Sequence, residues 1–241
     1  MAEQEVIKHT KKVFSIWNDP SHSLWHKIRE FITEILIIVF AISLSIWFHN
    51  WSEHKKEQAQ VKTFLSGLRN DISSDINDAK EIKKFFQHFD TTYRYLSGLQ
   101  RNKIPDMDSL KKMLPEIKYN IFLRPHKSRF TGFLSAGKIM TIEEDSLALQ
   151  ILDYYQEIIP SVTSSESAWV NSNASLQDYM RDNVKDIDSD LAKWEVLTSP
   201  KGKYLTKSLI PWSQIYERYD ALIISGEEII NKIDKIYPNK K

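Results

Sequence analysis

Histidine is the residue of this sequence best suited to proton transfer and metal binding, because its ring titrates near neutral pH. A zinc-protease helix needs His-Glu-x-x-His, and a metal-binding helical bundle needs Glu-x-x-His on facing helices. Neither pattern occurs in the sequence, and His22 and His26, one helical turn apart, stand beside a long apolar stretch. We therefore expect surface or interfacial histidines and no metal site. The seven histidines are His9, His22, His26, His49, His54, His88 and His126.

One acidic stretch resembles the opening of a calcium-binding loop. Asp186, Asp188 and Asp190 alternate along the chain, as the first three ligands of such a loop do. The sixth position is Leu191, where the loop needs glycine, and the twelfth is Leu197, where it needs a bidentate glutamate. We reject a calcium site on these two grounds.

Carboxylates one turn apart, such as Asp71 with Asp75 or Asp78, could in principle serve acid–base catalysis. We interpret them as a solvated helix face. No serine lies in a Gly-x-Ser-x-Gly turn, the six glycines form no phosphate-binding loop, and the lack of cysteine excludes thiolate nucleophiles and Cys-ligated metals. We predict no enzyme, no cofactor and no small-molecule substrate. The alternative is an enzyme whose buried Asp, Glu and His meet only in the fold, with strongly shifted pKa values.

The charge balance argues against nucleic-acid partners. Lys and Arg number 33 against 32 Asp and Glu, and the formal net charge of +1 offers no general attraction to a phosphate backbone. Hydrophobic residues make up 41% and charged residues 27%, close to globular averages, so most of the chain is expected in water.

An apolar stretch near the N-terminus predicts one transmembrane helix over about Ile32 to Trp51. Its centre, Ile35 to Phe48, holds no charge, proline or glycine. About 20 helical residues cross a hydrocarbon core of roughly 30 Å. Trp25 before the span and Trp47 within its end suit the two headgroup layers. The lipid bilayer is therefore an expected partner, and a cleaved signal peptide or a buried core helix is the alternative.

Basic residues on the two sides of the span predict its direction. A slight excess before the span places the N-terminus in the cytoplasm and the C-terminal domain outside it, in the periplasm of a bacterium. The basic residues before the span are Lys8, Lys11, Lys12, Lys27 and Arg29, and those after it are Lys55, Lys56, Lys62 and Arg69.

One face of the span carries small and polar residues. Glu34, Ile38, Ala41, Ser45 and His49 follow each other at steps of three and four, so they share a helical face. Because lipid tails offer no partner to polar groups, we predict that this face contacts a membrane protein or a second copy of the chain. The alternative is that Glu34 snorkels to one interface, His49 already lies in the other, and the small residues fill space.

Beyond a polar joint, Ser52 to Gln60, the apolar pattern continues at helical spacing. It predicts an all-α fold in which the membrane helix runs on into a long amphipathic helix packed in an extramembrane bundle. The stripe serves either as intramolecular core or for coiled-coil self-association. Its residues are Val61, Leu65, Leu68, Ile72, Ile76, Ala79, Ile82, Phe86, Phe89, Tyr93 and Leu96.

These patterns divide the chain into three parts: a tail or interfacial helix over residues 1–21, the membrane helix and joint over 22–60, and the bundle over 61–241. Within the bundle we predict a short helix capped by Asp106 or Asp108 and ended by Pro115, and another closed by Gly137. A longer helix starts near Glu143 and is kinked or ended by Pro160. Residues 197–211 read as a loop and 212–237 as a final amphipathic helix.

Three stretches resemble one known family. The first is the span and its exit, from Arg29 through Glu34 to Val39 and from Ile46 to Glu57, with Asn50-Trp51 before a charged helix. The second is Phe133 to Ile139 continuing to Ile142, Leu147, Ile151, Tyr154 and Tyr155, and the third is the isoleucine-rich final helix. The chain thereby resembles domain of unknown function 6090, single-span membrane proteins mostly of Bacteroidota. Ile38 and Val39 replace the family's usual small residues early in the span.

The resemblance implies a bacterial inner-membrane protein with a helical extramembrane domain, and no known activity. We expect a membrane-anchored interaction or scaffold protein of the envelope. The alternative is a single-span sensor or ligand-binding protein, which a pocket lined by Tyr154, Tyr155, Trp169 or Trp212 would indicate.

Overall fold

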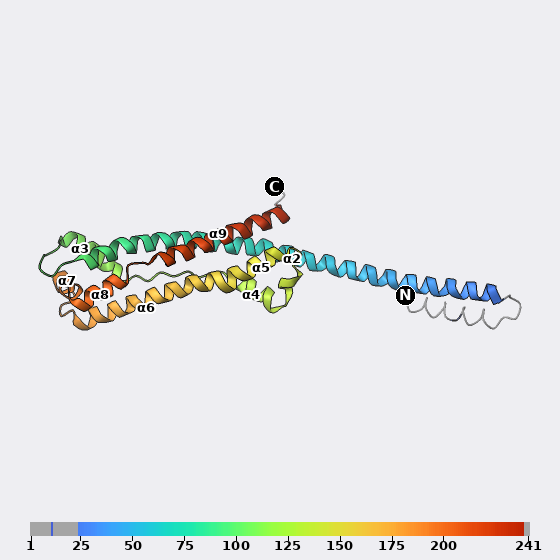
Figure 1. Ribbon diagram of the computed structural model, residues 1–241, viewed down its shortest axis with the longest axis horizontal. Helices are drawn as coiled ribbons and strands as arrows, with labels where there is room; N and C mark the ends of the chain where they lie inside the picture. The colour runs from blue at the N-terminus through green and yellow to red at the C-terminus, as the bar shows by residue number, and fades with distance from the viewer. Residues whose placement is uncertain (1–10, 12–23, 239–241) are drawn as a thin grey trace. The chain divides into compact units, whose positions relative to one another are not determined.

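The computed structural model describes Lys11 and residues 24–238 (Figure 1). Every regular element in this part of the chain is helical, which confirms the all-α prediction. The chain divides into two compact units, residues 1–60 and residues 61–241. The predicted tail or interfacial helix over residues 1–21, with Lys8, His9 and Lys12, lies outside the described residues apart from Lys11, and so does His22.

A single helix, α2, extends over Leu24–Gly98 and contributes to both units. No proline interrupts its 75 residues, and its last residue is Gly98, a residue type of low helix propensity. The prediction that the membrane helix continues without a break into the bundle is confirmed.

In unit 1, α2 presents its apolar side chains at the surface. Of the described part of the chain, this is the one helix long and apolar enough to span a membrane. Leu36, Val39, Phe40, Ile46 and Trp47 are all exposed. A core helix would be covered by neighbouring elements, so the exposure fits a lipid-facing helix better than the buried-core alternative.

In unit 2, three long elements lie side by side: α2, α9 (Ser213–Ile236), and the run of α5 (Asp145–Asp153), η3 (Tyr154–Ile158) and α6 (Ile159–Asn183) (Figure 1). Helix α9 is antiparallel to α2, as three ion pairs show. Arg69 binds Asp234, Lys80 binds Glu227 and Lys83 binds Asp220, so residue numbers fall along α9 as they rise along α2.

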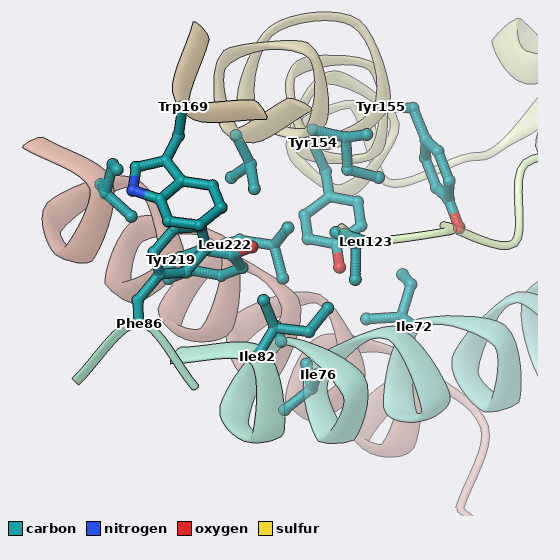
Figure 2. Close-up of a cluster of buried hydrophobic side chains, with 14 of the residues drawn as sticks. Ile72, Ile76, Ile82, Phe86, Leu123, Tyr154, Tyr155, Trp169, Tyr219 and Leu222 are labelled. Carbon is teal, nitrogen blue, oxygen red and sulfur yellow. The ribbon is translucent and has the colours of Figure 1, made fainter. Parts of the chain in front are cut away.

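The apolar stripe of α2 faces this three-element core. Aromatic side chains fill its centre: Phe89 stacks on Trp169 with ring centroids 4.8 Å apart, and Phe86 meets the edge of the same indole. Figure 2 shows Trp169, Phe86 and Tyr219 packed together beside Ile76 and Ile82 of α2. The indole Nε1 donates to the carbonyl of Leu209 at 3.0 Å, so the buried tryptophan has its polar group satisfied.

Pro160 neither ends nor breaks the helical run. Instead η3, directly before it, is a π-helical turn, in which the backbone hydrogen bonds reach one residue further than in an α-helix. Proline has no N–H to donate, so it fits where the hydrogen-bonding pattern changes, at the first turn of α6. The wider turn directs both Tyr154 and Tyr155 into the core.

Shorter elements complete unit 2. Helix α3 (Met107–Met113) begins at Asp106, whose carboxylate accepts from the Ser109 N–H, and the 3-10 helix η1 (Leu114–Lys118) follows it. Helix α4 (Ser128–Ser135) is followed by Gly137 at φ 70° and by η2 (Lys138–Thr141), as the glycine predicted. These caps confirm the local predictions for Asp106 and Gly137.

The prediction of a loop over residues 197–211 is wrong. Helix α7 (Asp190–Leu197) is followed at once by α8 (Pro200–Ser208). Ser199 caps α8 by accepting from the Gly202 N–H at 3.0 Å, and Pro200 occupies the first turn, where no N–H is needed. Gly202 allows the start of α8 to pack closely against the end of α7, because a Cβ there would lie 2.2 Å from the Val196 carbonyl oxygen.

Candidate functional site

The connection from η1 to α4 runs through unit 2 without regular structure and takes its hydrogen bonds from buried side chains. Glu166 Oε1 accepts from the Leu123 N–H at 2.8 Å, and Asp75 Oδ1 accepts from the His126 N–H at 3.0 Å. Backbone N–H groups inside a protein require partners, and this segment has no neighbouring strand or helical turn to supply them. The two carboxylates therefore hold the segment in place.

Two amides of α6 bind the end of η1 and the start of the connection that follows it. Gln177 Nε2 donates to the Ile117 carbonyl at 3.0 Å, and Asn173 Nδ2 donates to the Tyr119 carbonyl at 3.2 Å. Glu166, Asn173 and Gln177 are seven and four residues apart, so they share one face of α6. One helix face thus supplies three of the side chains that fix η1 and the connection.

The prediction that Asp75 lies on a solvated helix face is wrong. Asp75 is 0% exposed. Its Oδ1 lies 2.7 Å from the His126 ring Nδ1 in addition to the backbone bond. Burial raises the Asp75 pKa, opposed by the hydrogen bonds from His126, and the hydrogen bond to Asp75 raises the pKa of His126. His126 is a surface histidine as predicted, with its side chain 51% exposed, but its pairing was missed.

A signal for the burial of Asp75 was present in the spacing. Asp75 follows Leu68 by seven residues and Ile72 by three, so it lies on the buried face of α2. Asp71 pairs instead with Arg129 on α4, with Oδ2 at 2.9 Å from Nε. The guanidinium lies against Gly67, where a Cβ would be 2.3 Å from Arg129 Cζ.

Glu166 is the second buried carboxylate, and Tyr219 donates its hydroxyl to it. Burial raises the pKa of Glu166, while the Tyr219 and Leu123 hydrogen bonds oppose the rise. Buried Asp, Glu and His with shifted pKa values were the stated signature of an enzyme. Here each carboxylate holds backbone N–H groups, and Glu166 is only 2% exposed, so the geometry is that of structural support.

A groove of about 780 Å³ is lined by α3, η1, the C-terminal half of α6, the connection that follows it and the start of α7. Leu114 and Ile117 form one apolar side, and Met180 and Val184 form the other. Ile187 stands at the edge, 74% exposed. We call this surface the η1–α6 groove.

Charged side chains surround the apolar centre of the η1–α6 groove. Two of its acids are neutralised locally, since Asp178 binds Arg181 at 2.8 Å and Asp190 binds Lys193 at 2.9 Å. The charged lining residues are Lys111, Lys118, Arg181 and Lys193 together with Asp178, Asp188 and Asp190.

Tyr154, Tyr155, Trp169 and Trp212, the aromatics that a sensor pocket was expected to use, line neither this groove nor the polar hollow between α2 and α9. The first three are buried in the core. In the described part of the chain, no group of three His, Asp or Glu is arranged to hold a metal ion.

The predicted contact face of the span has partners within its own helix at two positions. Ser45 Oγ donates to the Ala41 carbonyl at 2.8 Å, and His49 Nε2 lies 3.4 Å from Glu53 Oε1. Glu34 is buried at 5% exposure, Ile38 is half-buried, and Ala41, Ser45 and His49 are exposed. Intrahelical bonding lowers the need of Ser45 and His49 for a second helix, so contact through this face stays a prediction.

The predicted bundle stripe lies in the core of unit 2. Its residues pack against the other helices of the same chain, which is the intramolecular alternative of the two. All of its members are buried: Val61, Leu65, Leu68, Ile72, Ile76, Ala79, Ile82, Phe86, Phe89, Tyr93 and Leu96.

Comparison with known families gave one result. The sequence profile of a family of unknown function, DUF6090, matches residues 34–174, more than half of the 241 residues. The chain belongs to the DUF6090 family. The DUF6090 region includes Asp75, His126 and Glu166 with the connection that they hold, and it ends at Ala174, where the α6 wall of the groove begins. Comparisons with curated proteins and with solved structures found no match.

Proposed function

We propose that this DUF6090 protein is a membrane-anchored helical module that works through protein contacts, as an interaction or scaffold component of the bacterial envelope. The apolar part of α2 anchors the chain in the inner membrane as a single span over about residues 32–51. The N-terminus lies in the cytoplasm and the helical unit in the periplasm, following the slight excess of basic residues before the span.

The observation that carries this proposal is the η1–α6 groove. Most large apolar side chains of unit 2 are used in its own core, whereas Ile187, which lines the groove, is 74% exposed, and Met180, which packs against the core, is only half-buried. An apolar surface with a charged rim is typical of a site that another protein covers. The buried carboxylates, in contrast, are occupied by the backbone and have a structural role.

Co-purification of the full chain from its own host tests the proposal. The tagged protein would be extracted in mild detergent and its companions identified by mass spectrometry, in parallel with Ile187→Glu and Leu149→Glu. Both positions carry an exposed aliphatic side chain, but only Ile187 lines the groove. We expect defined proteins to remain with the wild type and with Leu149→Glu and to be lost with Ile187→Glu. A lone, monodisperse monomer would contradict a scaffold function.

Orientation has its own test. Protease added to spheroplasts should digest the helical unit if it is periplasmic. A C-terminal unit that stays protected until the membrane is lysed would reverse the proposed direction.

A ligand-binding or sensor function is the second candidate, and the size of the groove favours it. About 780 Å³ lies within the range of small-molecule sites, roughly 300–1,000 Å³. Native mass spectrometry of the same preparation separates the two candidates. A bound compound of low mass, lost with Ile187→Glu, would favour a ligand over a protein partner.

A further inference from the structure

The shape of the η1–α6 groove suits a helix as its occupant. Its α6 wall extends from Ala174 to Arg181, and a separation of seven helical residues corresponds to a rise of about 10 Å, or about two turns. The opposite wall is formed by α3 and η1. A groove of that length between two helical walls accommodates the apolar face of an amphipathic helix, whose anchors recur at i, i+3 or i+4, and i+7.

The two walls of the groove differ in the charged side chains that form no ion pair in the described structure. Lys111 and Lys118 border the η1 side, seven residues apart, both exposed, and neither forms an ion pair in the described structure. Asp188 stands at the edge formed by the connection from α6 to α7 and likewise has no ion pair there. Arg181, Lys193, Asp178 and Asp190 are already paired within the groove. The unpaired charge is therefore positive on the wall formed by α3 and η1 and negative at the connection from α6 to α7.

This charge pattern selects one class of partner. An occupant with acidic side chains along the flank that meets Lys111 and Lys118 gains attraction there, and an occupant with basic residues on that flank is repelled. Acidic residues on the other flank would instead meet Asp188. The apolar contacts hold the occupant, and the charges determine its type and direction.

We propose that the η1–α6 groove binds an amphipathic helix of a partner protein that carries acidic residues along one flank of its apolar face. This inference rests on the proposed function, because it names the class of partner at the same surface. The occupant is defined by its chemistry: leucine-type anchors over about two turns and a one-sided acidic flank.

A displayed library of amphipathic helical peptides tests the inference on the full chain in lipid nanodiscs. The library keeps leucine at the anchor positions and randomises both flanks. We expect selected peptides to carry Asp or Glu on one flank and to bind at least about tenfold more tightly than the same peptides with Lys at those positions, an advantage that decreases as salt rises.

Charge reversal supplies the matched control. The double variant K111E/K118E should favour peptides with a basic flank, whereas K112E/K207E, which changes net charge equally at exposed positions outside the groove, should select as the wild type does. Ile187→Asp should abolish binding and Leu149→Asp should leave it unchanged.

Several outcomes would overturn the inference. These are equal selection of acidic and basic flanks, selection unaffected by K111E/K118E, peptides that bind empty nanodiscs equally well, and the absence of any selected helix. Each can occur while native proteins still depend on Ile187 in the co-purification. Failure of the inference is thus distinguishable from failure of the proposed function.

Discussion

The His126 ring Nδ1 lies 2.7 Å from Oδ1 of Asp75, a carboxylate with no exposed surface. The same carboxylate accepts from the His126 backbone N–H, so a single acid on α2 holds both the main chain and the ring of a residue 51 positions away. Asp71 and Asp78 on the same helix add negative potential at the ring. Arg129, Tyr154 and Tyr155 face the group from α4 and η3.

This pair predicts a loss of stability as pH rises. The folded-state pKa of His126 is raised above 6.5, so its contribution is complete below 6.5 and is lost as pH passes through the raised value. The raised pKa of Asp75 acts in the same direction, because its ionised form is disfavoured in the fold. Since the ring is half-exposed, we expect an effect of about 0.2–1 kcal/mol.

Thermal unfolding of the full chain in detergent at pH 6 and pH 8.5 measures this effect. His126→Gln should reduce the difference between the two midpoints. His88→Gln is the control, because His88 is also about half-exposed but lies 3.5 Å from Glu116, outside this pair. An equal pH response of wild type and His126→Gln would refute the assignment.

Glu166 should be far more sensitive to truncation than to loss of charge. Glu166→Ala leaves the buried Leu123 N–H and Tyr219 hydroxyl without an acceptor, and we expect a loss of about 2–5 kcal/mol in the free energy of unfolding. Glu166→Gln keeps an acceptor oxygen and should cost about 1 kcal/mol or less. Urea unfolding gives both values, with the exposed Glu217→Ala as the control. Equal losses for Ala and Gln would mean that the charge itself is what matters.

Gly226 allows α9 to approach α2 closely. A Cβ at this position would lie 2.9 Å from Ile76 Cδ1 and 3.0 Å from Ile72 Cγ2. Gly226→Ala should therefore cost about 1–3 kcal/mol through overpacking. Gly132 in α4 has no atom within 4 Å of a built Cβ, so Gly132→Ala should be neutral or stabilising by about 0.5–1 kcal/mol. Thermal midpoints that move together in the two variants would contradict this packing.

The anchor function of α2 can be tested with two phenylalanines of the same helix. Phe40 and Phe85 are both exposed, but only Phe40 lies within the apolar stretch. Phe40→Lys should impair membrane insertion, since a lysine at the centre of a span costs about 2.5–3.5 kcal/mol. Phe85→Lys should leave insertion intact. Alkaline carbonate extraction measures membrane insertion of both variants. Equal extraction of the two variants would contradict a membrane span that includes Phe40.

Local patterns of the sequence determined much of the fold. The spacing of Leu65, Leu68 and Ile72 predicted the core face of α2, because a helix brings every third or fourth residue to one side. Asp106 and Gly137 predicted a helix start and a left-handed turn, since both effects act within a few residues. The uncharged stretch from Ile35 to Phe48 predicted a helix able to span a bilayer, and the family followed from short motifs.

Only the tertiary structure decided which polar residues are buried and what they hold. Asp75 and Asp71 look alike in the sequence, yet the first supports the main chain 51 residues away and the second binds a surface arginine. Helix α8 was missed because Pro200 and Gly202 are helix breakers on average, whereas here one fits the first turn and the other fits against Val196. The η1–α6 groove combines residues from separate helices. Periodicity reports the face that a residue occupies on its own helix, but long-range contacts determine what that face meets.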